Sequence, residues 1–96
     1  MPKYILSVKA DKDQDDIAEY TLEKWSEKQA LEYIVGLVAC FEKIAKAPDI
    51  GRDASEFSLN LKRFNYKAHS VFYMSIDTGI LIVRILGQKQ DFRLHL

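Results

Sequence analysis

Two helical patterns with almost no linker between them constrain the fold of this chain more than any other feature. Apolar side chains recur at three- and four-residue spacing over about Lys9–Trp25 and again over Ala30–Ala45. Between them, Ser26–Gln29 matches a capping box, in which serine and glutamine side chains satisfy free amides at a helix start. Pro48 prevents the second helix from continuing. Because the connection is so short, the two helices must lie antiparallel.

The rest of the chain reads as four strands. A turn at Pro48–Arg52 and a polar connector to Ser58 lead from the helices into three segments rich in β-branched and aromatic residues. Asp77–Gly79 forms the last hairpin turn, where Gly79 is free to take a positive φ. The predicted strands are Lys3–Val8, Leu59–Tyr66, Ser70–Ile76 and Ile80–Leu86.

The order of these elements predicts the fold class. A strand, a helix hairpin and a meander give an α+β domain, in which an antiparallel two-helix hairpin packs on a small, mainly antiparallel twisted sheet. The 96 residues fit one domain, residues 1–96. No apolar run approaches the roughly 20 residues that a bilayer span needs, and the start of the chain lacks the apolar region of a secretory signal. We therefore expect a cytoplasmic protein.

The net charge of zero hides an uneven distribution. Residues 1–50 hold seven lysines and ten carboxylates, which gives −3, and residues 51–96 hold seven basic groups and four carboxylates, which gives +3. This asymmetry favours an acidic partner for the second half, although solvated helices followed by strands also explain it. Asp13, Asp15 and Asp16 are expected on a solvated face of the first helix.

Two features of the second helix bear on partners and chemistry. Leu31 and Val35 fall partly off its apolar stripe, so we expect deeper burial in the monomer, with a partner surface as the alternative. Cys40 lies among apolar residues and is expected to be a core thiol rather than a nucleophile. It has no cysteine or histidine at metal-ligand spacing, and we predict no metal and no cofactor.

Several short blocks of the chain carry a family resemblance. They are Ala18–Thr21 with Trp25, Pro48–Arg52, Leu61–Phe64, Val71–Tyr73, and Ile82–Leu86 with Asp91. In order and spacing, these blocks resemble the ParE toxins of the RelE/ParE superfamily over nearly the whole chain.

The resemblance implies a RelE/ParE-like fold and the toxin component of a type II toxin–antitoxin system. It implies that a ParD-like antitoxin neutralises the protein in a hetero-oligomer. It also implies that the free toxin inhibits DNA gyrase and blocks replication without catalysing a reaction. On this interpretation DNA is contacted only through the antitoxin, and there is no membrane partner.

The chain departs from the family pattern after its last arginine-bearing strand. Many relatives carry a motif like Arg-Val-Leu-His-x-Arg-x-Asp, whereas Arg84–Asp91 has Gly87 in place of the histidine and Lys89 in place of the second arginine. Lysine keeps the charge but loses the planar fork of arginine. The changes leave the predicted fold intact and bear on the strength of target inhibition. A degenerate, inactive toxin is therefore one alternative.

A second alternative is a ribosome-dependent mRNA endoribonuclease of RelE type. Such an enzyme needs cations for the phosphate and groups that transfer protons. Arg63 and Arg84 are predicted to share one sheet face, with Lys62 or Lys89 as further cations.

The candidates for proton transfer have simpler explanations. His69 is expected in a solvated hairpin turn, and His95 in a mobile tail. Tyr66 and Tyr73 are expected to be half-buried packing residues with hydroxyls at the rim. Because Gly87–Gln88 stands where RNase relatives commonly carry a histidine or tyrosine, we predict no catalytic residues and favour binding.

The binding interpretation names two sets of residues. Apolar anchors on the second helix and basic side chains of the strands are expected to receive an acidic antitoxin segment that is disordered when free. For gyrase, we expect the tail Gln88–Leu96 to combine charge with exposed apolar groups, with a closing segment over the core as the alternative. The antitoxin set is Leu31, Val35, Val38, Arg63, Lys67, Arg84 and Lys89, and the target set is Lys89, Phe92, Arg93 and Leu94.

Overall fold

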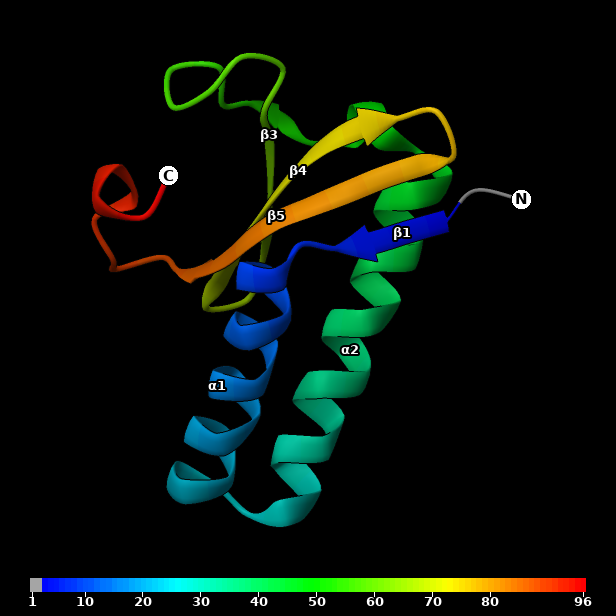
Figure 1. Cartoon of the computed structure of the whole chain (residues 1–96). Coiled ribbons are helices and arrows are strands. Elements are labelled where there is room, and N and C mark those ends of the chain that lie inside the picture. Colours follow the sequence, from blue (N-terminus) through cyan, green and yellow to red (C-terminus); the bar gives the residue numbers. More distant parts are fainter. Residues whose placement is uncertain (1–2) are drawn as a thin grey trace.

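The computed structural model describes residues 3–96, in which two helices lie on one side of a five-stranded sheet (Figure 1). This arrangement confirms the predicted α+β fold with a helix hairpin. The elements in chain order are β1 (Lys3–Leu6), α1 (Val8–Lys24), α2 (Glu27–Lys46), the 3-10 turn η1 (Pro48–Ile50), β2 (Arg52–Asp53), β3 (Lys62–Tyr66), β4 (His69–Ile76), β5 (Gly79–Gly87) and the 3-10 turn η2 (Phe92–Leu94).

The sheet has the strand order β1-β5-β4-β3-β2. β1 pairs parallel with β5 and every other pair is antiparallel, so the first strand of the chain lies beside the last. β2 is not among the predicted strands, because a strand of two residues is too short to show an alternating pattern. β3 begins at Lys62 rather than at Leu59, since Asn60 has a φ of 65° and Leu59 is 80% exposed.

Serine caps set the start of both helices. Ser7 Oγ accepts a hydrogen bond from the amide of Ala10 at 3.0 Å, so α1 begins at Val8, a residue that the sequence pattern assigned to the first strand. Ser26 Oγ accepts a hydrogen bond from the amide of Gln29 at 3.1 Å, which confirms the serine half of the predicted capping box at the start of α2. No helix within residues 3–96 is both long and apolar enough to cross a bilayer.

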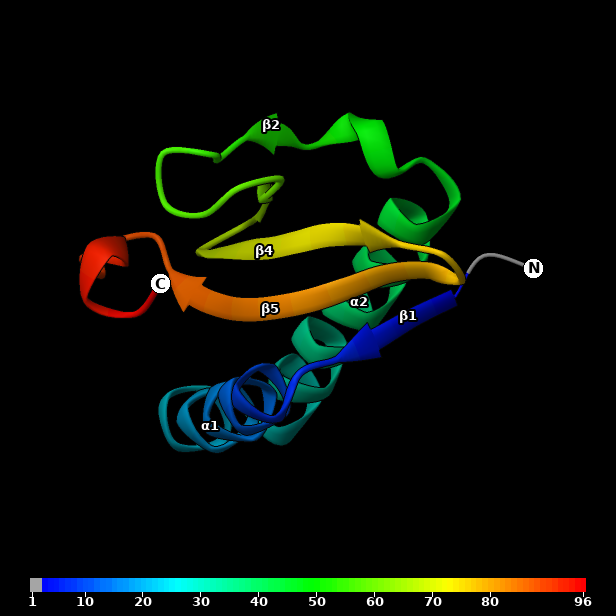
Figure 2. The ribbon, with the colours of Figure 1, turned by 45° about the horizontal axis from the view of Figure 1, so that its top comes forward.

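The larger core lies between the helices and the sheet. Figure 2 shows the helices and the strands from another direction. Leu37, Phe41 and Ile44 of α2 are fully buried in one cluster with Ile80 and Ile82 of β5. Burial of each such side chain stabilises the fold by about 1.5–3 kcal/mol. This cluster therefore holds the hairpin on the sheet.

Cys40 belongs to the same cluster and is 6% exposed, which confirms its prediction as a core thiol. Burial raises the pKa of the Cys40 thiol, against the smaller opposing effect of the Lys43 charge. The thiol is therefore protonated and unreactive at neutral pH.

Tyr73 ties this core to the turn after α2. Its hydroxyl donates a hydrogen bond to the carbonyl of Pro48 at 2.6 Å and accepts one from the amide of Gly51 at 2.9 Å. The ring leaves no room for a Cβ at Gly51. Tyr73 is fully buried, so the predicted half-buried position with a hydroxyl at the rim is wrong, whereas Tyr66 is half-buried as predicted.

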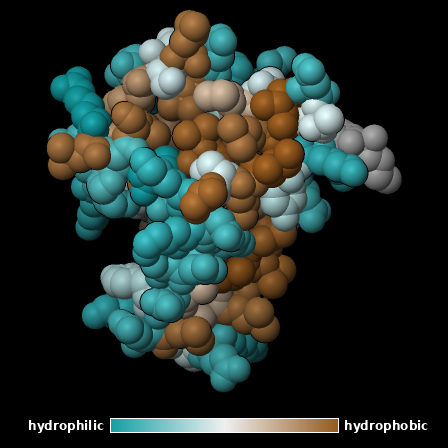
Figure 3. Space-filling view, in the orientation of Figure 1, coloured by the Kyte–Doolittle hydropathy of each residue, from teal (hydrophilic) through white to brown (hydrophobic). Residues whose placement is uncertain are grey.

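The second face of the sheet is covered only in part. Phe72 and Leu86 are buried beneath Phe57, from the loop before β3, and Phe92 of η2. The three phenylalanine rings meet edge to face with centroids 5.0 to 6.0 Å apart. The tail thus closes over a second cluster, while the surface over β5 beyond it is hydrophobic (Figure 3).

Leu31 and Val35 are 64% and 59% exposed, so their predicted burial in the monomer is wrong. The reason is that the helix hairpin projects beyond the sheet (Figure 1). In the first half of α2, Tyr33 reaches His69 at the start of β4, whereas Leu31 and Val35 lie on exposed sides of the helix. Val38, nearer the sheet, is half-buried. Leu31 and Val35, with Val38 at the end nearer the sheet, form an exposed apolar stripe on α2. This exposure agrees with the alternative prediction, in which the stripe is a partner surface.

Gly79→Ala is expected to lower the free energy of unfolding by more than about 2 kcal/mol. The φ of 149° disfavours a side chain there, and the backbone of Lys3 occupies the place of a Cβ. Gly87→Ala is the matched control, because the nearest atom to its Cβ is the flexible Gln90 side chain at 3.4 Å, and it should stay within about 0.5 kcal/mol of the parent. Urea denaturation measures both, and equal effects would contradict the prediction.

Candidate functional site

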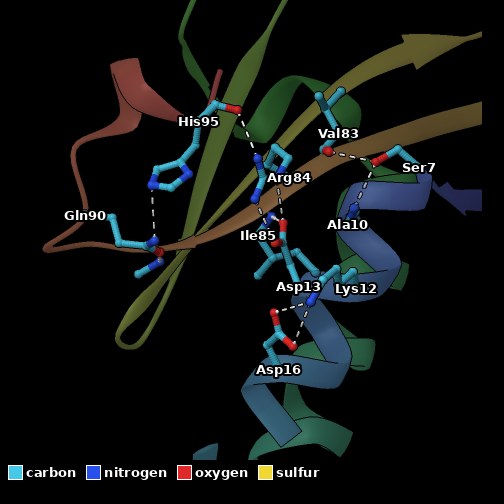
Figure 4. Close-up of polar contacts among 11 residues, drawn as sticks. Ser7, Ala10, Lys12, Asp13, Asp16, Val83, Arg84, Ile85, Gln90 and His95 are labelled. Atoms are coloured by element: carbon cyan, nitrogen blue, oxygen red, sulfur yellow. Dashed lines mark hydrogen bonds and ion pairs between the residues drawn. The ribbon is translucent and has the colours of Figure 1, made fainter.

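An ion pair joins the first helix to the last strand (Figure 4). Arg84 donates from Nε to Asp13 Oδ2 at 2.8 Å and from Nη2 to Asp13 Oδ1 at 2.9 Å. The two side chains are only 15% and 12% exposed. The predicted solvated position of Asp13 is therefore wrong, although Asp16 is solvated and forms an exposed pair with Lys12. The hydrogen bond with Asp13 raises the pKa of Arg84, against the opposing effect of burial.

The start of α1 also provides hydrogen-bond partners for the backbone of β5 beyond the point where β1 ends. The Ser7 amide donates to the carbonyl of Ile82 at 2.9 Å, and Ser7 Oγ donates to the carbonyl of Val83 at 2.7 Å. Asp13 Oδ2 accepts from the amide of Ile85 at 3.0 Å. Backbone groups that no strand pairs thus find partners on α1 (Figure 4).

Arg84 also holds the tail. Its Nη1 donates to the carbonyl of His95 at 3.0 Å, so the prediction of a mobile tail around His95 is wrong. Arg63 places its guanidinium 5.6 Å from the centre of the Phe92 ring. Phe92 is half-buried by these contacts rather than exposed as predicted. The exposed members of the predicted target set are Lys89, Arg93 and Leu94.

The register of the sheet brings the arginines into one row. Arg52 pairs with Arg63, Arg63 pairs with Phe72, and Phe72 pairs with Arg84. Because cross-strand partners point to the same face, the prediction that Arg63 and Arg84 share a sheet face is confirmed. A register shift between Phe72 and Tyr73 marks a bulge where this row meets β5.

A second polar cluster lies on the opposite face, beside the helices. The Tyr33 hydroxyl and His69 Nδ1 are 2.6 Å apart, and Lys67 Nζ lies 5.8 Å from the Tyr33 ring and 5.4 Å from the Tyr66 ring. His69 is the first residue of β4 and is half-buried, so its predicted solvated position is wrong. Burial lowers the pKa of His69 and raises that of Tyr33. The imidazole is therefore neutral at pH 7.

Gly87 pairs with His69 across the strands. Its amide donates to Gln90 Oε1 at 2.6 Å, which starts the turn into the tail. Lys89 is exposed in this turn. Among residues 3–96, no group of three or more histidine, cysteine, aspartate or glutamate side chains is placed to hold a metal ion.

Asp13→Asn is expected to lower the free energy of unfolding by about 3 kcal/mol, because it leaves the largely buried Arg84 without its counter-charge. Asp16→Asn is the matched control on the same helix, and loss of its exposed pair with Lys12 should cost less than about 0.5 kcal/mol. Urea denaturation at pH 7 measures both variants. A loss for Asp13→Asn no larger than that for Asp16→Asn would show that the ion pair contributes little.

His69 is expected to make stability depend on pH. Burial lowers its pKa below the usual 6.5, so the unfolded chain binds a proton at higher pH than the folded chain does. Its contribution is complete above about pH 6.5 and declines as the pH falls below that value. Melting temperatures at pH 7.5 and 5.5 should fall less for His69→Gln than for the parent. His95→Gln is the control and should keep the parental fall; an identical fall in all three proteins would refute the assignment.

Comparisons with known proteins agree on the family. A family model described as "ParE toxin of type II toxin-antitoxin system, parDE" matches residues 4–92. The toxin ParE1 of Caulobacter vibrioides is 34% identical over 96 residues, which cover 100% of this chain and 99% of that protein. The toxin ParE of Escherichia coli is 29% identical over 97 residues, which cover 100% and 94%.

The fold has a solved counterpart. A chain from the chromosomal ParDE TA system of P. aeruginosa superposes with a TM-score of 0.77 at 17% identity, covering 91% of this chain and 96% of that one. At this identity the likeness shows the fold, and the sequence matches above show the family. The chain belongs to the ParE toxins of type II toxin–antitoxin systems.

Proposed function

We propose that this chain inhibits DNA gyrase and is neutralised by a ParD-like antitoxin. The family match along residues 4–92 carries this proposal. The tail supports it, because Lys89, Arg93 and Leu94 present charge and apolar surface beside Phe92, which is held against the sheet. In this proposal Phe92 positions the tail, and the three exposed residues contact gyrase.

The candidate catalytic groups for RNA cleavage lie on different faces of the sheet, which favours inhibition by binding over catalysis. His69 contacts Tyr33 on the helix face, whereas Arg63 and Arg84 lie on the other face, so these groups do not meet at one phosphate. Arg84 is already paired with Asp13. The ring of His95 points toward Gln90 and away from Arg84 (Figure 4). A ribonuclease of RelE type is therefore the less supported alternative.

The antitoxin binds, on this proposal, along the exposed apolar stripe of α2. Leu31 and Val35 supply apolar anchors, with Val38 at the end nearer the sheet. An apolar stripe on a helix is a common docking element for a segment that folds on binding. Of the basic antitoxin set, Arg63, Lys67 and Lys89 receive its carboxylates, while Arg84 contributes by holding the tail.

A gyrase supercoiling and cleavage assay with purified protein, run beside a ribosome-dependent mRNA cleavage assay, tests the proposal. We expect lost supercoiling or accumulated cleaved DNA, with intact mRNA. Cut mRNA with unaffected gyrase would replace the proposal with the ribonuclease alternative. Inactivity in both assays would identify a degenerate toxin, for which the changes at Gly87 and Lys89 are the first explanation to test.

Tail variants locate the contact within the same assay. The double substitution Arg93→Ala and Leu94→Ala should weaken gyrase inhibition about tenfold or more, as loss of interface anchors does, with no change in melting temperature. Leu22→Ala with Lys24→Ala is the matched control, since it also removes one exposed apolar and one exposed basic side chain, on α1. Equal inhibition by both double variants would move the contact away from the tail.

A further inference from the structure

A row of apolar side chains crosses the part of the second sheet face that the tail leaves open. Ile5 pairs with Leu81, and Leu81 pairs with Met74, so the row spans β1, β5 and β4. The flanking residues Tyr4 and Ile80 belong to the core beside the helices, so the row points to the opposite face. Ile5 is 50% exposed, and Leu81 and Met74 are half-buried.

This row forms a continuous surface. Figure 3 shows hydrophobic side chains gathered over β5 and its neighbouring strands. Val83 and Met74 pack at the margin of the second buried cluster, whereas Leu81 belongs to neither cluster. The row is therefore an extension of a core that nothing within residues 3–96 covers. A contiguous apolar area of this kind marks an interaction site.

The charged side chains around the apolar row indicate which kind of partner could bind there. The sheet register places Lys3 of β1 and Arg84 of β5 on this face, together with Arg63 of β3 and Arg52 of β2. These are all the charged side chains that the five strands present on this side, and all are basic. An apolar area bordered by cations fits an apolar surface bordered by carboxylates.

We infer that this open half of the sheet face binds an acidic amphipathic segment of the antitoxin. The segment lays its apolar side on Ile5, Leu81 and Met74 and directs its carboxylates toward Lys3 and Arg63. The inference rests on the proposed function, since it takes the antitoxin as the partner. It adds a second contact area, separated by the sheet from the apolar stripe of α2.

A second copy of this chain fits the surface less well than the antitoxin does. A two-fold dimer apposes the same patch on both subunits. Such a contact would bring Lys3 and the arginines of one copy toward those of the other, and like charges across an interface oppose association.

The test is a titration of the full chain with its cognate ParD-type antitoxin. Ile5→Glu should weaken the affinity about tenfold or more, and Ile5→Lys, which removes the same apolar group but keeps the basic border, should weaken it less. Leu22→Glu is the control, since Leu22 is 53% exposed on α1, away from this face. Equal melting temperatures of the variants establish that each is folded. Leu81→Ser is a second test, because it removes an apolar side chain of the row without adding a charge.

The outcomes separate this inference from the proposed function. If Ile5→Glu and Leu81→Ser bind like the parent while Leu31→Glu binds weakly, the antitoxin uses α2 alone, and the inference falls while the proposed function stands. If the parent does not bind the antitoxin at all, both fall. Self-association of the parent that Ile5→Glu abolishes would make the occupant a second copy, which also overturns the inference.

Discussion

The open edge of β5 is the constraint on which the rest of the structure depends. β5 has nine residues and β1 has four, so the second half of this inner strand lacks a strand on one side. Unpaired backbone groups beside a core are costly. Ser7 and Asp13 satisfy them, and in doing so they start α1, place it against the sheet and bring a carboxylate to Arg84. Arg84 in turn holds the tail.

The charge asymmetry of the chain becomes a difference between two sides of the molecule. α1 carries six acidic and three basic side chains, and it lies with α2 on one side of the sheet. On the other face, the charged side chains of the five strands are all basic, and of these Arg84 is paired with Asp13. An acidic partner segment is therefore repelled by α1 and attracted to the sheet. α2 has equal numbers of acidic and basic side chains, so its effect on such a segment is intermediate.

Local patterns in the sequence predict the helices, the cap of α2, the last two strands and the family, because each depends on residues close together in the chain. Asp13 shows what such patterns miss. Its partner Arg84 is 71 positions away, and nothing near Asp13 distinguishes it from Asp15 or Asp16. The local pattern likewise places His69 in an ordinary turn, because it does not reveal that α2 brings Tyr33 beside this residue. For Leu31 and Val35 the error is the reverse, because burial is predicted and the side chains are exposed. Their apolar character does not reveal that the helix hairpin extends past the sheet.

The pairing of β1 with β5 has a consequence for how the chain reaches its folded state. The first strand gains its only strand neighbour when the last one is available, so the sheet closes through contacts between residues about as distant in the chain as they can be. Loop closure of this kind is slow compared with helix formation. During synthesis the α1–α2 hairpin is complete before β5 exists. The apolar stripe of α2 is then available to a partner before the tail has a surface on which to dock.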